Sequence, residues 1–258
     1  MHFPKRSALA SRRNAPRRRA ATTRSLRYQP LESREFLNGD PHWWITAGDE
    51  SSDAIDASAI DADGNLYVAV SYSGAIDLAP EETFADNRDL LIGTTADALA
   101  KYDADGRLEW VRPFAELAPS QSGTSGVRVD GIEIDAGGAY LNGRLDGLID
   151  LDVESPAADS IIDSTQFEKG AAFVARFDAD TGTFEWAHSS GAISASGNTH
   201  YTVDHDLAVD RHGTAYFAFD SASLNTYFSS NSIFFTFNGQ QLGNSEGFYQ
   251  QTWLAVID

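Results

Sequence analysis

The chain has 258 residues, a formal net charge of −19 and no cysteine, and 42% of its residues are hydrophobic. This composition is sufficient for a folded core, and the lack of cysteine excludes disulfides, thiolate metal sites and a cysteine nucleophile. No apolar run approaches the ~18 residues of a membrane span, so the sequence predicts no transmembrane segment.

Residues 1–40 differ in charge from the rest of the chain. They hold ten Lys and Arg against three acidic residues, whereas residues 41–258 hold nine basic and 35 acidic ones. A short, unpatterned, Arg-rich segment is typical of a disordered export or targeting tail. An acidic body repels phosphate backbones, so we expect residues 41–258 to bind no nucleic acid.

Three markers recur through residues 41–258 with one period of about 75 residues. The first closes a strand with Asp, the second places Asp before a turn glycine, and the third is a Trp. Their positions are Asp103, Asp178 and Asp258; Asp61, Asp135 and Asp210; and Trp110 and Trp186, with Trp44 as the corresponding residue one repeat earlier. Shared spacing in three series indicates a tandem repeat.

Each marker lies in a short run of Val, Ile, Leu, Tyr and Phe bounded by Asp-Gly or Asp-Thr-Gly, which is a hairpin signal. Helical periodicity is absent, so the chain is predicted to be all-β. The first copy is expected to have four strands over residues 56–61, 65–78, 97–103 and 107–113. Antiparallel four-stranded units in radial repetition are the blades of a β-propeller, and we predict copies at about 43–114, 115–190 and 191–258.

The repeat resembles a known family. The runs Gly64–Val70, Ser73–Leu78 and Ala96–Trp110 are similar to the bacterial SBBP-type β-propeller repeat, and Gly147–Leu151 and Phe173–Trp186 keep the same skeleton in the second copy. The resemblance implies the fold more securely than a function. Members of this family are typically secreted or surface proteins of unassigned activity.

Leu31–Leu37 resembles the LEPR-x-L-L segment found near the start of exported bacterial proteins, from which Ser33 and Phe36 depart. The resemblance implies an extracellular or cell-surface location. It would also account for a basic N-terminal segment that lacks the apolar region of a signal peptide.

Asp178, Gly182 and Trp186 have the spacing of the tryptophan-docking motif of quinoprotein dehydrogenase propellers, and copy one shortens that spacing by one residue. In that family the motif packs blades together, with the Trp between neighbouring blades, so it does not place a quinone cofactor. An enzymatic propeller, quinoprotein-like or polysaccharide-active, is therefore the alternative to a non-enzymatic module.

Two groups of residues suggest a metal. Asp61, Asp63 and Gly64 begin like a calcium loop, but position 12 of that loop is Tyr72, and Asp and Gly also suit a tight hairpin. We therefore expect a turn there, and another at Asp103–Gly106. His200, His205 and His212 lie among acidic residues, but a strand turns His205 and Asp206 to opposite faces, so three surface or loop histidines are expected.

No catalytic, cofactor-binding or metal-binding residue is predicted. The sequence has no G-x-S-x-G motif and no phosphate-binding glycine loop, and its 38 carboxylates are too many to single out a catalytic pair. The expected function is non-enzymatic binding or scaffolding, with a protein or a carbohydrate as partner and no cofactor.

Copy three has no fourth strand after Trp253–Asp258, while Trp43–Thr46 stands as an orphan strand at the other edge. Pairing the two would complete three blades, fewer than the 4–8 of closed propellers. Two hypotheses stay open: the chain is a piece of a longer propeller, or two chains supply six blades. Exposed sheet edges predict self-association, and alternation around Ile233–Phe237 predicts extra strands.

Overall fold

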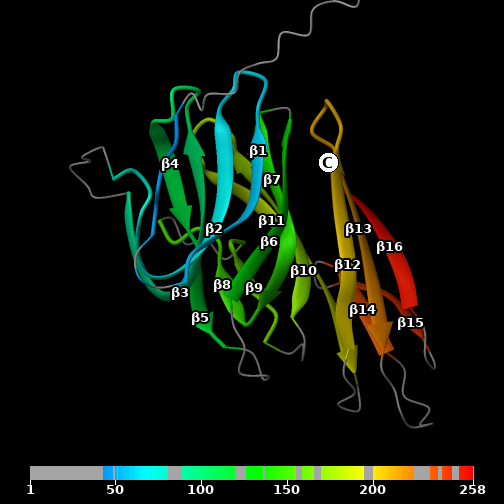
Figure 1. Ribbon diagram of the computed structural model, residues 1–258. Coiled ribbons are helices and arrows are strands. Elements are labelled where there is room, and N and C mark those ends of the chain that lie inside the picture. Colours follow the sequence, from blue (N-terminus) through cyan, green and yellow to red (C-terminus); the bar gives the residue numbers. More distant parts are fainter. Residues whose placement is uncertain are drawn as a thin grey trace, which may run out of the picture. The chain divides into compact units, whose positions relative to one another are not determined.

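The computed structural model contains sixteen β-strands and no helix among the residues that it describes (Figure 1). The described residues are 43–48, 50, 52–80, 89–119, 126–135, 137–154, 159–165, 170–194, 200–223, 233–237, 240–245 and 250–257. Within them the prediction of an all-β chain is confirmed. The basic segment 1–40, with its LEPR-like run, lies outside the described residues.

The first repeat forms a four-stranded antiparallel sheet, which we call sheet 1. Its order is β1-β2-β3-β4, with bounds Ala54–Ile60, Leu66–Asp77, Leu90–Tyr102 and Leu108–Pro113. These strands lie close to the predicted ones except that β3 begins seven residues earlier than expected. It is longer because the β2–β3 ladder continues past a register shift at Tyr72/Gly74 to the pair Asp77 and Leu90.

The second repeat supplies the four strands β6, β7, β10 and β11 of a six-stranded sheet, which we call sheet 2. Their bounds are Gly126–Asp135, Gly138–Asp146, Ala171–Asp178 and Phe184–Ser194. A hairpin from the third repeat, β14 (Ile233–Phe237) and β15 (Gln240–Ser245), continues the sheet from β11. The predicted extra strands are thus present, and they extend the neighbouring repeat.

The third repeat forms sheet 3, with order β12-β13-β16 and bounds His200–Val209, Ala215–Ser223 and Gln250–Ile257. A fourth, small sheet joins β5 (Ala115–Ala118), β8 (Leu148–Asp150) and β9 (Ile161–Asp163). All strand pairs among the described residues are antiparallel. The described residues do not form a closed ring of sheets.

Trp43–Thr46 does not complete sheet 3. Among the described residues β16 pairs only with β13, and residues 43–48 form no strand. Trp43 and Ile45 instead pack on the apolar side of sheet 1. The described residues of one chain thus show no pairing of the first and last strands, because the tryptophan finds its apolar contacts on the adjacent sheet.

Consecutive sheets bury opposite faces against each other. Because side chains alternate along a strand, each sheet has a forward face, directed to the next sheet in the sequence, and a rear face. The forward face of sheet 1 and the rear face of sheet 2 share one core cluster, which includes Tyr67, Leu99, Trp110, Phe173 and Phe177. The forward face of sheet 2 packs in the same way on the rear face of sheet 3, through Tyr140, Val174, Phe217 and Phe219.

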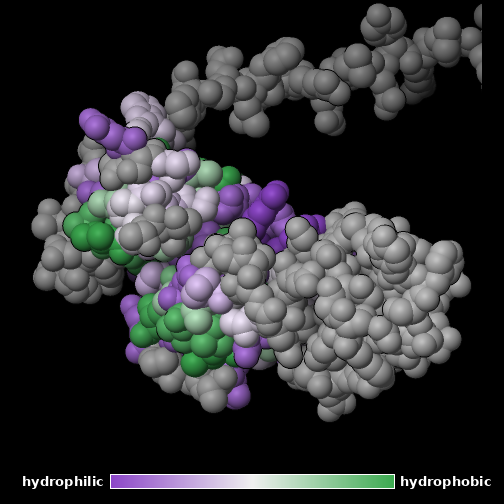
Figure 2. Space-filling view, turned by 90° about the horizontal axis from the view of Figure 1, so that it is seen from below, coloured by the Kyte–Doolittle hydropathy of each residue, from purple (hydrophilic) through white to green (hydrophobic). Residues whose placement is uncertain are grey.

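The surface is mixed in polarity. Figure 2 shows hydrophobic residues gathered in two separate groups on the side it presents, with hydrophilic residues between them. Large exposed apolar side chains of the described residues include Ile92, Leu117, Leu254 and Val256. The described residues include no apolar helix of the length needed to cross a bilayer.

Candidate functional site

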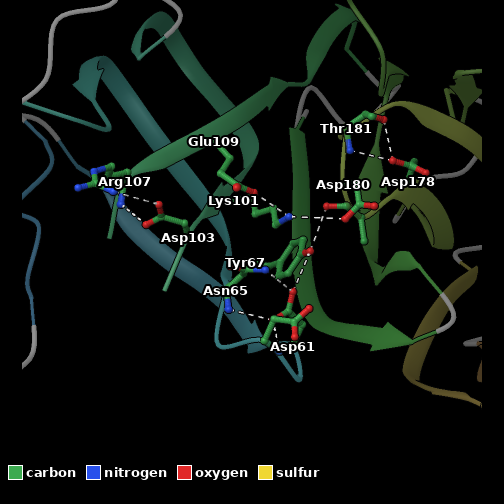
Figure 3. Close-up of polar contacts among 12 residues, drawn as sticks. Asp61, Asn65, Tyr67, Lys101, Asp103, Arg107, Glu109, Asp178, Asp180 and Thr181 are labelled. Carbon is green, nitrogen blue, oxygen red and sulfur yellow. Dashed lines mark hydrogen bonds and ion pairs between the residues drawn. The ribbon is translucent and has the colours of Figure 1, made fainter. Parts of the chain in front are cut away.

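The aspartates before the turn glycines serve the hairpins. The Asp61 carboxylate accepts the backbone N–H groups of Asp63 and Asn65, at 3.0 and 2.9 Å, and the side-chain amide of Asn65 (Figure 3). Asp103 accepts the N–H groups of Asp105 and Arg107 in the same way. The predicted turns are therefore confirmed at Asp61 and Asp103, where the carboxylate oxygens accept hydrogen bonds from backbone N–H groups.

These hydrogen bonds change the acidity of the turn aspartates. Burial alone would raise the pKa of Asp61, but the hydrogen bonds from Asn65 and Asp63 outweigh it and lower the pKa. Hydrogen bonds from Thr181 lower the pKa of Asp178, and the backbone N–H of His212 does so for Asp210. Turn carboxylates of this kind stay ionised and carry fixed negative charge.

A tryptophan from one sheet docks on a turn glycine of the next. A Cβ on Gly182 would lie 2.7 Å from ring atoms of Trp110, and Arg112 donates from its guanidinium to the carbonyls of Thr181 and Gly182 at 2.7 and 2.9 Å. Trp43 lies against Gly106 in the same way, with ring atoms 2.5–2.9 Å from the Cβ position. This contact requires a residue without a side chain.

The residue that corresponds to Trp110 is Trp43 and not Trp44. Trp43 docks on Gly106 and donates its indole N–H to the carbonyl of Ala104 at 3.1 Å, whereas Trp44 is 76% exposed. The predicted alignment was one residue out of register, because sequence identity alone cannot distinguish two adjacent tryptophans. Trp186 does match Trp110, since each meets a tyrosine edge-on at an interplanar angle of 64°.

A tyrosine on the second strand of each sheet extends this docking. The hydroxyl of Tyr67 donates to the carbonyl of Ala179 in sheet 2 at 3.0 Å, and that of Tyr140 donates to the carbonyl of Gly213 in sheet 3 at 3.0 Å. Each hydrogen bond joins two sheets. Both tyrosines lie a few residues after the marker aspartate that precedes the turn glycine. Their hydrogen bonds between sheets were not predicted from the sequence.

A basic residue lies over each of these two tyrosines. Lys101 sits 5.5 Å from the ring centroid of Tyr67 and pairs with Glu109 at 2.7 Å, with Asp180 of the next sheet 4.0 Å away (Figure 3). Burial alone would lower the pKa of Lys101, but the hydrogen bond to Glu109 and the contact with Tyr67 outweigh it and raise the pKa. Arg176 repeats the arrangement with Tyr140 and Glu185.

The forward face of sheet 3 is different, and we call it the end face. Tyr216, Leu254 and Val256 form it and are 40%, 67% and 57% exposed. Tyr216 pairs across the ladder with Val256, at the position where Tyr67 pairs with Lys101 and Tyr140 with Arg176. The end face thus keeps the tyrosine but replaces the charged residue by an apolar one.

The rear face of sheet 1 carries a pocket of about 350 Å³. Its walls include Trp43 and Ile45 on one side and Val68, Val70 and Tyr102 on the other. In the other two sheets the corresponding rear-face positions are covered by the preceding sheet. Val68, Val70 and Tyr102 are themselves only 6%, 5% and 4% exposed, so the rear face of sheet 1 is buried apart from this pocket.

Polar groups gather where the first strands of the repeats meet, and one residue of β3, Asp97, joins them. We call Asp56, Asp97, Arg128, Asp130 and His205 the first-strand cluster. Strand β6 contacts both β1 and β12. Asp130 lies 2.8 Å from Nε of Arg128 and 3.1 Å from Nε2 of His205. The cluster therefore joins residues of all three sheets.

Asp97 is the most perturbed carboxyl group of this cluster. It is 6% exposed and accepts the backbone N–H of Val127 from sheet 2 at 3.1 Å. Burial, reinforced by the negative charge of Asp56 and opposed by the hydrogen bond from Val127, raises the pKa of Asp97 to about 7. Burial also raises the pKa of Asp56. A carboxyl group with such a pKa exchanges a proton near neutral pH.

The histidine prediction is correct only in part. His205 lies in β12 with a side chain that is 3% exposed, next to Asp130, so it is not a surface or loop residue. His212 is exposed in the β12–β13 turn, as expected. His205 and Asp206 do face opposite sides, because Asp206 is exposed. The side chain of His200 lies outside the described residues.

No protein-family model and no curated protein matches this chain. The resemblance to SBBP-type repeats and to the LEPR-x-L-L segment therefore stays a prediction. What the structure adds is a repeated way of docking one sheet on the next, with one forward face left exposed.

One periodic signal in the sequence could have located part of the first-strand cluster. Asp56, Asp130 and His205 each lie five residues before a marker aspartate, at Asp61, Asp135 and Asp210. They are therefore equivalent positions of three repeats. Asp97 has no such signal, because its burial depends on the approach of Val127 from another sheet.

Proposed function

We propose that this chain is a non-enzymatic module of β-propeller type, exported to the bacterial surface or exterior, that acts by binding or scaffolding. The observation that carries the proposal is the exposed apolar end face of Tyr216, Leu254 and Val256. Clustered exposed apolar side chains on a folded protein are typical of interaction surfaces.

The use of the recurring residues supports the same proposal. Trp110, Tyr67 and Lys101 hold sheet 1 against sheet 2, and the turn aspartates accept backbone N–H groups. The side chains that recur from repeat to repeat thus pack one sheet on the next. What the repeats have in common is this docking geometry. Sheets that dock face to face in series are consistent with propeller blades.

The test is a binding survey of the folded full-length chain with a glycan array and an array of surface and extracellular proteins. We expect a partner whose binding is reduced at least about tenfold by L254R. L117R is the matched control, because Leu117 is an exposed leucine on the small sheet at 51% exposure. Binding that is equally strong in both variants would remove the end face from the proposal.

The enzymatic alternative is a quinoprotein-like or polysaccharide-active propeller, and Asp97, which is 6% exposed and has a pKa of about 7, is the described residue on which we test it. Its test is cofactor absorbance in the purified protein and turnover on polysaccharides, compared between the wild type and D97N. Turnover that D97N abolishes, in a variant that still folds, would replace the non-enzymatic proposal.

A further inference from the structure

The interface between sheets recurs twice within the chain. Sheet 1 docks on sheet 2 and sheet 2 on sheet 3, each time with a forward-face tyrosine that donates to a carbonyl of the next sheet and a leucine or valine beside it, Leu99 or Val174. The two surfaces that would form a third interface of this kind are the end face of sheet 3 and the rear face of sheet 1.

The end face carries the forward-face residues of the repeat. Tyr216 corresponds to Tyr67 and Tyr140, and Leu254 corresponds to Leu99 and Val174. Leu99 and Val174 are fully buried at the internal interfaces, whereas Leu254 is 67% exposed. The end face therefore exposes to solvent the residues whose equivalents in the other two sheets are buried.

The rear face of sheet 1 carries the matching surface. Val68, Val70 and Tyr102 correspond to rear-face positions of sheets 2 and 3. They are only 4–6% exposed, and the opening on this face is the 350 Å³ pocket that they line. Trp43 is already docked on Gly106, in the place that Trp110 takes on Gly182. Since Trp110 comes from the fourth strand of the preceding sheet, Trp43 occupies the position of a fourth-strand tryptophan for which the described chain supplies no preceding sheet.

We infer that two copies of this chain associate head to tail. The end face of one copy packs at the pocket on the rear face of sheet 1 of the next copy, and Trp43–Thr46 of that second copy pairs with β16 of the first as its fourth strand. This inference rests on the proposed function as a scaffold and names its partner as a second copy of the chain. An assembly of this type closes into a ring or continues as a filament.

The internal ladders fix the register. Lys101 pairs with Trp110 in sheet 1, and Arg176 pairs with Trp186 in sheet 2. Val256 is the equivalent residue of β16, so it pairs with Trp43 of the second copy, and two residues further along Leu254 pairs with Ile45. In this register Trp43 and Ile45 face the second copy's own sheet 1, on which they already pack, and Trp44 faces away, in keeping with its exposure.

The first experiment is sedimentation of the full-length chain over a range of concentrations. We expect species heavier than the 28.0 kDa monomer, and we expect the double variant L254R/V256R to associate at least about tenfold more weakly. L117R should associate like the wild type. A wild-type chain that is monomeric at all concentrations would overturn the inference.

The second experiment tests the register and does not depend on the arginine variants folding. The chain has no cysteine, so I45C and L254C can be made as separate single-cysteine proteins and oxidised as a mixture. We expect the mixed disulfide to form faster than either homodisulfide, because opposite residues of an antiparallel pair come within disulfide distance. An excess of the L254C homodisulfide would show a head-to-head contact and contradict the inference.

The two proposals fail separately. If the chain is monomeric and forms no mixed disulfide, a second copy is not the partner. The array survey then still tests whether another partner binds the end face. Catalytic turnover would overturn the non-enzymatic role without changing the outcome of sedimentation or cross-linking.

Discussion

The interface between sheets 1 and 2 and the end face of sheet 3 use equivalent positions for opposite purposes. At the interface, Tyr67 lies under Lys101 and donates across to sheet 2, and both side chains are buried. At the end face, Tyr216 is 40% exposed and stands beside Val256. The repeat thus pairs tyrosine with a charged residue where another sheet covers it, and with an apolar residue where none of the described sheets does.

This difference has a physical reason. Lys101 is buried, and its charge is compensated by two carboxylates that reach solvent, Glu109 on its own sheet and Asp180 on the next. A charge at such a position is favourable only if those partners are present. Valine needs no partner, so the end face can be covered by any surface of matching shape, including that of a second copy.

The sharpest test of the comparison replaces each of two tryptophans by alanine. Trp110 is 5% exposed and docks on Gly182, so W110A should lower the free energy of unfolding by about 3–5 kcal/mol. Trp44 is 76% exposed, and W44A should change it by less than about 0.5 kcal/mol. Urea denaturation followed by circular dichroism measures both, and equal losses would contradict the assigned docking.

Two substitutions distinguish a glycine on which a tryptophan docks, Gly182, from a glycine that only forms a turn, Gly137. Gly182 and Gly137 both have positive φ, at 69° and 75°, but a Cβ meets Trp110 at 2.7 Å in the first and nothing within 4 Å in the second. G137A should cost about 1 kcal/mol through its backbone alone, and G182A about 2–3 kcal/mol because the ring must also move. Similar unfolding midpoints for the two variants would show that the tryptophan is not tightly docked.

The buried Asp97 should make stability depend on pH. Its pKa in the folded chain, about 7, lies above the unfolded value of 3.8, so its contribution is fully present below pH ~4 and is lost as the pH rises through ~7. D97N, which keeps an acceptor for Val127, should therefore be more stable than the wild type at pH ~8, by about 2–4 kcal/mol, since one pKa unit corresponds to about 1.4 kcal/mol. The gain should vanish below pH ~4, and a gain that is constant with pH would contradict the assignment.

The smallest expected effects come from single hydroxyl groups. Y67F and Y140F each remove a hydrogen bond between sheets and should cost about 1 kcal/mol. Y216F should have no measurable effect on the unfolding of the monomer, because its ring is on the exposed end face. Thermal unfolding at one fixed pH compares all three, and a loss in Y216F equal to the others would contradict the difference between the faces.

The amino-acid sequence by itself determined the local features of this protein. Alternating apolar residues, and turns in which Asp61 and Asp103 accept backbone N–H groups, predict the strands and hairpins, because both signals act within a few residues. The strand predicted at 65–78 is observed at Leu66–Asp77. The common period of the markers likewise predicts that the unit recurs.

Only the tertiary structure decided which surfaces meet. In the structure Trp43, and not Trp44, docks on a glycine, and Asp97 is buried where it accepts the N–H of Val127. The hairpin of the third repeat pairs with sheet 2 and not with sheet 3. These outcomes depend on contacts between residues far apart in the chain, where neither periodicity nor propensity carries a signal. The exposure of Tyr216, Leu254 and Val256 is of the same kind, because equivalent residues are buried or exposed according to the sheet that packs on them.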